Sequence, residues 1–207
     1  MPESIIQFLL ASVLLTISPG PDIIYVLVTG LSKGVKYGIL LTTGLVSGIL
    51  VHTSLVAFGL SAIIKTSETL FFGIKLFGAL YLMYLAYKIF KQPADIDISK
   101  NTSSKVNNNY IKQGFLMNVL NPKVTIFFMA FLSQFLWDKT NDTVMQFYVL
   151  GIIFMIQAFI IFSLVAIFAD RFYKLIKNNP KSGYFFKYLQ ISVFIFIAVF
   201  ILISHDY

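Results

Sequence analysis

Six predominantly apolar stretches, each about 20 residues or longer, constrain this chain more than any other feature. A helix of that length crosses the ~30 Å hydrocarbon core of a bilayer. Only 12% of the residues are charged, against about 25% in soluble domains, which leaves too little polar surface for a water-soluble globule. We therefore predict an all-α polytopic membrane protein with six transmembrane helices. The stretches run from about Ser4 to Thr29, Gly38 to Ile64, Leu70 to Ile89, Gln113 to Trp137, Val144 to Ala169 and Tyr184 to Ser204.

The distribution of basic residues predicts the orientation of these spans. Twelve of the 16 Lys and Arg residues lie near the first, third and fifth connections. Basic residues gather on the cytoplasmic side of membrane proteins, so we predict that these connections are cytoplasmic and that both termini are extracytoplasmic. The net charge of +7 reflects this bias and indicates no nucleic-acid partner. The twelve are Lys33, Lys36, Lys88, Lys91, Lys100, Lys105, Lys112, Arg171, Lys174, Lys177, Lys181 and Lys187.

Proline interrupts the first and fourth stretches, at Pro19-Gly20-Pro21-Asp22 and at Asn121-Pro122-Lys123. Each break falls in the first of three spans, and the second set of three starts from the opposite side. A duplicated unit would then be an inverted repeat, which places a binding site at the repeat interface near the bilayer midplane. We predict one transmembrane domain over residues 1–207, with repeats over about 1–90 and 113–207 and a cytoplasmic loop over about 91–112.

Proline at the first helical position sacrifices no hydrogen bond, so Pro21 and Pro122 can each begin a half-helix, with Asn121 as the N-cap of the second. The N-termini of both half-helices attract negative charge. Asp22 suits a cation or a proton, and Lys123 suits a carboxylate or Asp22 itself. The pattern favours a zwitterion such as an amino acid. The alternative is two proline kinks with a structural Asp–Lys pair and no ligand.

The depth of the two charges supports this pairing. Asp22 lies eleven residues before Lys33, and Lys123 lies eleven residues after Lys112. If both lysines mark the cytoplasmic interface, both inner charges lie about 16 Å deep, near the centre of the bilayer.

His52 lies inside the second apolar stretch. Its side chain titrates near neutral pH, which makes it a candidate proton relay. A histidine that packs between helices and bonds to a neighbour explains the same position equally well.

Glycines recur at four-residue spacing around the first connection. Small residues at this spacing let membrane helices approach closely. They indicate packing within the chain or, as the alternative, a homodimer face. The glycines are Gly30, Gly34 and Gly38, followed by Gly44 and Gly48.

Several function classes lack their required residues. The chain has no cysteine, which excludes thiolate metal sites and dithiol chemistry. It also has no phosphate-binding Walker loop and no zinc-ligand pattern. We therefore predict a protein that is not an enzyme and has no cofactor and no bound metal. Any transport would be driven by an ion gradient or by a partner, not by ATP.

Several blocks of residues form a pattern that extends along the chain: Ser18-Pro19-Gly20-Pro21-Asp22, the glycines from Gly30 to Gly48, the block from Gly114 to Lys123, Phe127-Phe128 and Ser133-Gln134-Phe135. In this pattern the chain resembles the LysE/RhtB-type amino-acid exporters of bacterial inner membranes. The resemblance covers essentially the whole chain, including its size and its basic central loop. Asp22 stands where the family often has Asn, and Ser133 stands where it usually has Pro.

The resemblance implies a secondary transporter that exports amino acids or their derivatives, driven by the proton-motive force. Family members carry lysine, homoserine, threonine, leucine and others, and no residue here selects among them. The implied substrate and coupling site comprises Pro19, Gly20, Pro21, Asp22, Asn118, Asn121, Pro122 and Lys123.

Three alternatives to this function remain. One is an exporter of a small ion, a metal or another metabolite. A second is a membrane-embedded enzyme, which would need another buried acid or histidine facing Asp22. A third is a non-transporting scaffold, in which the first and fourth spans would pack solidly at Pro21 and Pro122.

Overall fold

The computed structural model describes residues 2–18, 20–93, 109–138, 141–178 and 181–203, and every element within these ranges is helical. The predicted all-α class is confirmed, and most predicted ends agree within four residues. The helices are α1 Pro2–Ile17, α2 Pro21–Lys33, α3 Val35–Leu55, the π-helical turn η1 Val56–Leu60, α4 Ser61–Thr66, α5 Glu68–Lys91, α6 Tyr110–Val119, α7 Pro122–Phe131, the 3₁₀ turn η3 Leu132–Phe135, α8 Thr143–Ile167, α9 Ala169–Asn178 and α10 Ser182–Ile203.

Four helical segments of the described chain are long and apolar enough to cross a membrane: 35–63, 69–91, 143–167 and 182–203. Two further spans exist if each bent helix pair counts as one, α1 with α2 and α6 with α7. These pairs bend by 59° and 58°. The chain thus has up to six spans, with the first and fourth broken as predicted.

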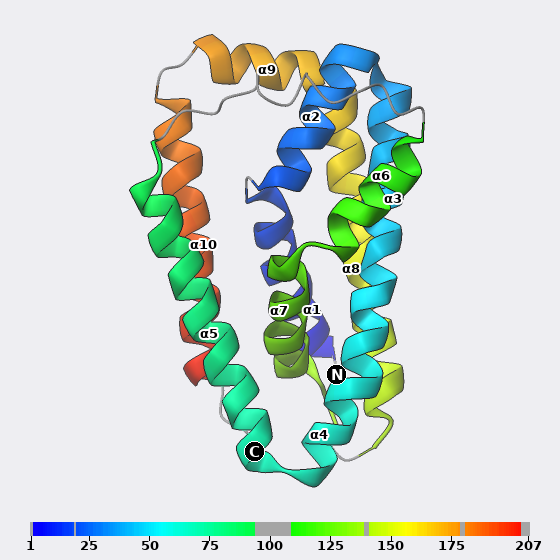
Figure 1. Ribbon diagram of the computed structural model, residues 1–207, viewed down its shortest axis with the longest axis vertical. Coiled ribbons are helices and arrows are strands. Elements are labelled where there is room, and N and C mark those ends of the chain that lie inside the picture. The colour runs from blue at the N-terminus through cyan, green and yellow to red at the C-terminus, as the bar shows by residue number, and fades with distance from the viewer. Residues whose placement is uncertain (1, 19, 94–108, 139–140, 179–180, 204–207) are drawn as a thin grey trace.

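The six spans alternate in direction along the bundle (Figure 1). In that view α1 and α2 rise from the lower end, α3 descends and α5 rises again. The second half begins at the upper end, where α6 and α7 descend, α8 rises and α10 descends. The two halves therefore start from opposite ends, as an inverted repeat requires, while the repeat itself and the orientation in the membrane stay predictions.

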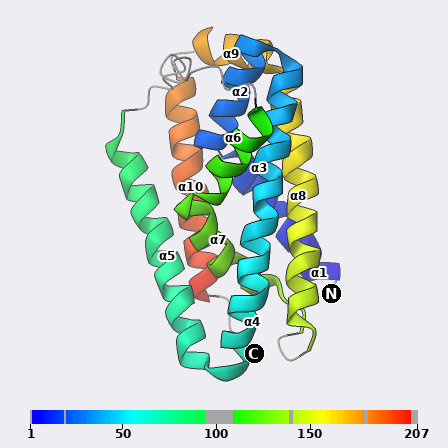
Figure 2. The same ribbon diagram turned by 45° about the vertical axis from the view of Figure 1, so that its right-hand side comes forward.

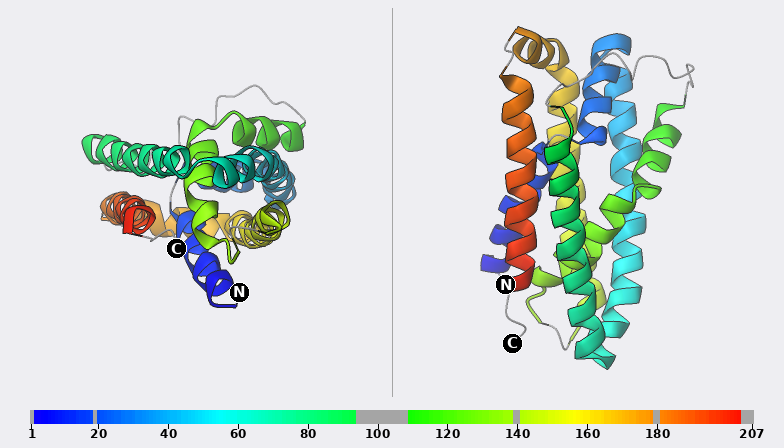
Figure 3. Two further views of the ribbon diagram at one scale, coloured as in Figure 1. Left: turned by 90° about the horizontal axis from the view of Figure 1, so that it is seen from below. Right: turned by 60° about the vertical axis from the view of Figure 1, so that its left-hand side comes forward.

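The helices form two groups. Helices α5 and α10 pack against each other on one side, while α3 packs against α6 and α8 on the other (Figures 2 and 3). Helices α1 and α7, each one half of a broken span, lie between the two groups. Helix α7 contacts both α5 and α10. The largest core cluster is rich in phenylalanine, including Phe8, Phe131 and Phe135. The outward faces are also apolar, as expected of a surface that contacts lipid.

The regularly spaced glycines pack within the chain. A Cβ atom on Gly44 would collide with the backbone of Ile111, and one on Gly114 would collide with the backbone of Leu41. Gly30 and Gly38 face α8 and Gly48 faces Asn118 in the same way. The structure therefore supports the first of the two predicted roles, because α6 and α8 cover the glycine faces that a homodimer would have used. Gly34 instead adopts φ +103° between α2 and α3, a conformation that favours glycine.

The connection between the fifth and sixth spans contains a helix that the sequence analysis missed. Helix α9 lies across the upper end of the bundle, roughly perpendicular to the spans (Figure 1). It carries an ion pair at its surface, between Asp170 and Lys174 at 2.7 Å. The predicted loop over 91–112 lies largely outside the described residues.

Candidate functional site

Both proline breaks start half-helices as predicted. Helix α2 begins at Pro21, with Gly20 in extended backbone as its N-cap. Helix α7 begins at Pro122, and the carbonyl of Asn121 accepts the backbone N–H of Val124 at 3.1 Å. The first residue of a helix has no carbonyl partner for its N–H, so the half-helix that each proline begins loses no hydrogen bond of its own.

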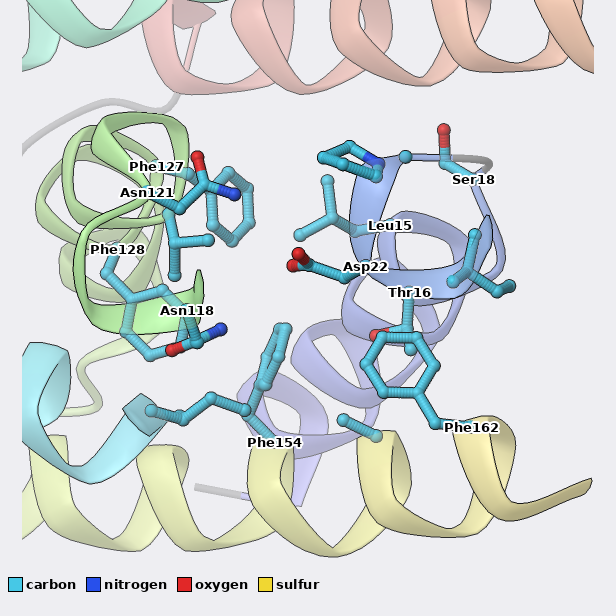
Figure 4. Close-up of a pocket in the computed structure, with 16 residues that line it drawn as sticks. Leu15, Thr16, Ser18, Asp22, Asn118, Asn121, Phe127, Phe128, Phe154 and Phe162 are labelled. Atoms are coloured by element: carbon cyan, nitrogen blue, oxygen red, sulfur yellow. The ribbon is translucent and has the colours of Figure 1, made fainter. Parts of the chain in front are cut away.

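Residues from both breaks line a single cavity (Figure 4). The cavity has a volume of about 80 Å³. Span one contributes Asp22 and the residues on either side of it, and span four contributes Asn118 and Asn121. The described lining residues are Leu15, Thr16, Ser18, Gly20, Pro21, Asp22, Ile23, Ile49, Asn118, Asn121, Val124, Phe127, Phe128, Phe154, Ala158 and Phe162.

The polar groups lie on opposite sides of the cavity. The half-buried carboxylate of Asp22 points across it from span one, and the amide nitrogens of Asn118 and Asn121 face it from span four (Figure 4). Asp22 is the only ionisable side chain among the described lining residues. The buried hydroxyl of Ser18 has no hydrogen-bond partner in the described chain. The cavity thus offers an anionic acceptor facing neutral donors.

The rest of the described wall is mostly apolar and includes four phenylalanines. Phe154, Ala158 and Phe162 follow one another at four-residue spacing, so they share one face of α8. Phe127 and Phe128 of α7 also line the cavity. The sequence analysis singled out only the last two, within the resemblance. Helix α8 is apolar almost throughout, so its sequence carries no periodic signal that marks the cavity face.

His52 lies behind Asn118. Its side chain is only 1% exposed. Its Nε2 atom lies 3.0 Å from the backbone carbonyl oxygen of Asn118, and its Nδ1 atom lies 3.2 Å from the hydroxyl of Thr125. The structure therefore shows a histidine that packs between helices with hydrogen bonds, and the proton-relay role stays a prediction.

Three of the predicted site residues lie wholly or partly outside what the structure describes. Pro19 lies outside the described residues. Pro122 and Lys123 belong to the first turn of α7, but their side chains lie outside what the structure describes. The pairing of Asp22 with Lys123 therefore stays a prediction.

The sequence analysis also missed a buried cation. Lys75 lies within α5 and is only 3% exposed. Its Nζ atom lies 6.0 Å from the centre of the Phe71 ring, within reach of a cation–π contact. Lys75 is not among the cavity-lining residues described above.

Comparison with known proteins connects this geometry to a family. The family model described as LysE type translocator matches residues 13–205. A leucine efflux protein from Enterobacter sp. (strain 638) is 30% identical over 185 residues, or 85% of each chain. A leucine efflux protein from Klebsiella pneumoniae is 28% identical over 182 residues, or 86% of each chain.

An uncharacterized membrane protein from Vibrio cholerae is 30% identical over 166 residues, or 80% of each chain. No solved structure matches this chain significantly. The family match spans both breaks and all the cavity-lining residues, and it makes the protein a membrane transporter rather than an enzyme. The chain belongs to the LysE type translocator family.

Proposed function

We propose that this protein exports amino acids with apolar side chains, leucine first among them, across the bacterial inner membrane in exchange for protons. The observation that carries this proposal is a single cavity that combines a carboxylate, amide donors and aromatic walls. The names of two relatives, both leucine efflux proteins, point to the same class of substrate.

Each part of a zwitterionic amino acid has a counterpart in the cavity. The carboxylate of Asp22 accepts hydrogen bonds from the α-ammonium group. The amides of Asn118 and Asn121 donate to the α-carboxylate, and the N-terminus of α7 adds partial positive charge beside them. Charged groups leave water only when they are paired, so these contacts are needed for entry into an apolar cavity. The side chain of the substrate then packs against the phenylalanine rings.

Proton coupling follows from the single carboxylate. Asp22 can hold the ammonium group of the substrate or a proton, but not both. Proton-driven export requires that the substrate and a proton occupy Asp22 in alternation. In the predicted orientation, protons reach Asp22 from the extracytoplasmic side and the substrate reaches it from the cytoplasm.

A competition assay with purified protein in liposomes tests the substrate class. Labelled leucine is exchanged against an internal pool while unlabelled amino acids compete from outside. We expect isoleucine and methionine to compete, and lysine and glutamate to fail because the walls offer no counter-charge. Equal competition by lysine or glutamate would overturn the substrate class.

The same assay tests proton coupling through its pH dependence. Protonation of Asp22 removes the acceptor for the ammonium group, so the half-saturation concentration for leucine should rise as the pH falls. A half-saturation concentration that is independent of pH would remove Asp22 as the coupling group.

The alternatives predict other outcomes. A scaffold would have packed spans one and four solidly at Pro21 and Pro122, whereas the structure has a cavity at Pro21 and beside the second break. Wild-type protein that exchanges none of the tested amino acids would favour an exporter of an ion or another metabolite.

A further inference from the structure

The break in span four releases one particular carbonyl group. In an α-helix, the N–H of each residue bonds to the carbonyl four residues earlier. The residue four positions before Pro122 is Asn118, and proline has no N–H to offer. The carbonyl of Asn118 lies inside the bundle, where a backbone acceptor without its partner is costly.

Two groups replace the missing proline N–H. The backbone N–H of Asn121 donates to the Asn118 carbonyl at 3.0 Å. The second donor comes from another span, since Nε2 of His52 on α3 lies 3.0 Å from the same oxygen. A carbonyl oxygen only accepts, so Nε2 must carry the hydrogen. In the neutral imidazole, Nδ1 is then the acceptor.

The other ring nitrogen contacts the other half of the same span. Nδ1 of His52 lies 3.2 Å from the hydroxyl of Thr125, which belongs to α7. A single imidazole therefore bonds to α6 through Asn118 and to α7 through Thr125. It bridges the 58° bend from the side of α3.

We propose that His52 is a positioning residue that sets the angle between the two halves of span four. That angle determines where the amides of Asn118 and Asn121 point, and both amides face the cavity (Figure 4). His52 thus acts on substrate binding through Asn118 and Asn121 without touching the substrate. This inference rests on the proposed function, because the amides matter only if a ligand binds between the breaks.

A matching contact at the other break supports this role. Nε2 of Gln157 on α8 donates to the hydroxyl of Thr16 at the end of α1, at 2.9 Å. A side chain of span five thus bonds to span one, just as a side chain of span two bonds to span four. Thr16 and Asn118 are 102 residues apart and His52 and Gln157 are 105 apart, close to the offset of 101 between Pro21 and Pro122. In each half, the second span supplies one polar side chain to the broken span of the other half.

The test uses three variants of the full-length protein in liposomes: His52→Gln, His52→Leu and Thr125→Val. Glutamine keeps an amide N–H donor for the Asn118 carbonyl but does not titrate. We measure leucine counterflow, which needs no net proton movement, and uptake driven by a pH gradient. His52→Gln should retain counterflow and gradient-driven uptake within about twofold. His52→Leu should raise the half-saturation concentration for leucine roughly tenfold, which corresponds to the loss of one hydrogen bond at the upper end of the usual range of strengths. Thr125→Val should raise it about threefold.

Two results would overturn the proposal. In the first, His52→Gln keeps counterflow but loses gradient-driven transport, which makes His52 a proton relay. In the second, Thr125→Val and any folded His52→Leu protein show the half-saturation concentration of the wild type. If His52→Leu does not fold, Thr125→Val decides alone. Thermal melting of the purified variants separates this inference from the proposed function: a melting temperature lowered in His52→Leu but not in His52→Gln supports the bridge even if leucine is not the substrate.

Discussion

The two proline breaks have the same backbone design and opposite chemistry. Each places proline at the first position of a half-helix, and the two spans bend by nearly the same angle, 59° and 58°. The break in span one presents the carboxylate of Asp22, while the break in span four presents the amides of Asn118 and Asn121 (Figure 4). The comparison shows that one local geometry can supply an acceptor in one half of the molecule and donors in the other.

The breaks also differ in how neighbouring spans hold them. His52 contacts both halves of span four, through Asn118 and Thr125. In the described part of span one, the hydrogen bond of Gln157 goes to Thr16, on the α1 side of the break. The other half of span one, α2, is linked to α6 by a hydrogen bond from Gln113 to Tyr25. The bend in span four is therefore fixed by one side chain, whereas the bend in span one has separate supports on either side.

The largest effect is expected at the charged break. Asp22→Asn removes the charge but keeps the size, and hydrogen bonds to charged groups are worth about 1.5–3 kcal/mol. We therefore expect leucine transport in liposomes to fall roughly 10- to 100-fold. Asp170→Asn, an exposed carboxylate on α9 paired with Lys174, is the matched control and should transport normally. Normal transport by Asp22→Asn would mean that the charge difference between the breaks has no role in function.

A smaller effect is expected at the neutral break. Asn118→Leu replaces the amide by a side chain of similar size. Because Asn121 and the N-terminus of α7 still face the α-carboxylate, we expect a net loss of about 0.5–1.5 kcal/mol, below the full value of a hydrogen bond to a charged group. The half-saturation concentration for leucine should rise roughly 2- to 10-fold, less than the loss at Asp22. Met117→Leu, the neighbouring position on α6, conserves volume and serves as the control. An Asn118→Leu defect larger than that of Asp22→Asn would reverse the assignment of acceptor and donor sides.

The smallest effect is expected at Gln157. Gln157→Leu removes the contact to Thr16, whose hydroxyl still donates to the carbonyl of Ser12 at 2.8 Å. We expect a change of about twofold in the half-saturation concentration, smaller than that of His52→Leu. The measurement is the same counterflow assay at equal amounts of reconstituted protein. A Gln157→Leu effect equal to that of His52→Leu would show that the two breaks are held alike.

The spans and their breaks were predictable because their causes are local. Apolar length identifies a span, and proline interrupts a helix wherever it stands. Residues on both sides of the cavity were therefore identified from sequence, including Asp22 and Asn121. The crosswise helix α9 was missed because its basic residues were interpreted only as a marker of orientation.

Other parts of the site depend on which helices face each other, and a single sequence does not encode that locally. The partners of His52 are a carbonyl freed by a proline 70 residues away and a hydroxyl on the next half-helix. The aromatic wall from α8 was hidden because phenylalanines occur on every face of the apolar spans. The burial of Lys75 was not predicted, because a lysine near the end of a span is usually counted with the adjoining loop.

The contact between Gly44 and Gly114 restricts the route that a substrate can take. The backbones of α3 and α6 touch there with no side chain between them. A side chain can rotate aside to open a gap, but a backbone cannot do so without moving its whole helix. No solute can therefore pass between α3 and α6 at this point. A molecule that moves between the cavity and the upper end of the bundle must pass between other helices.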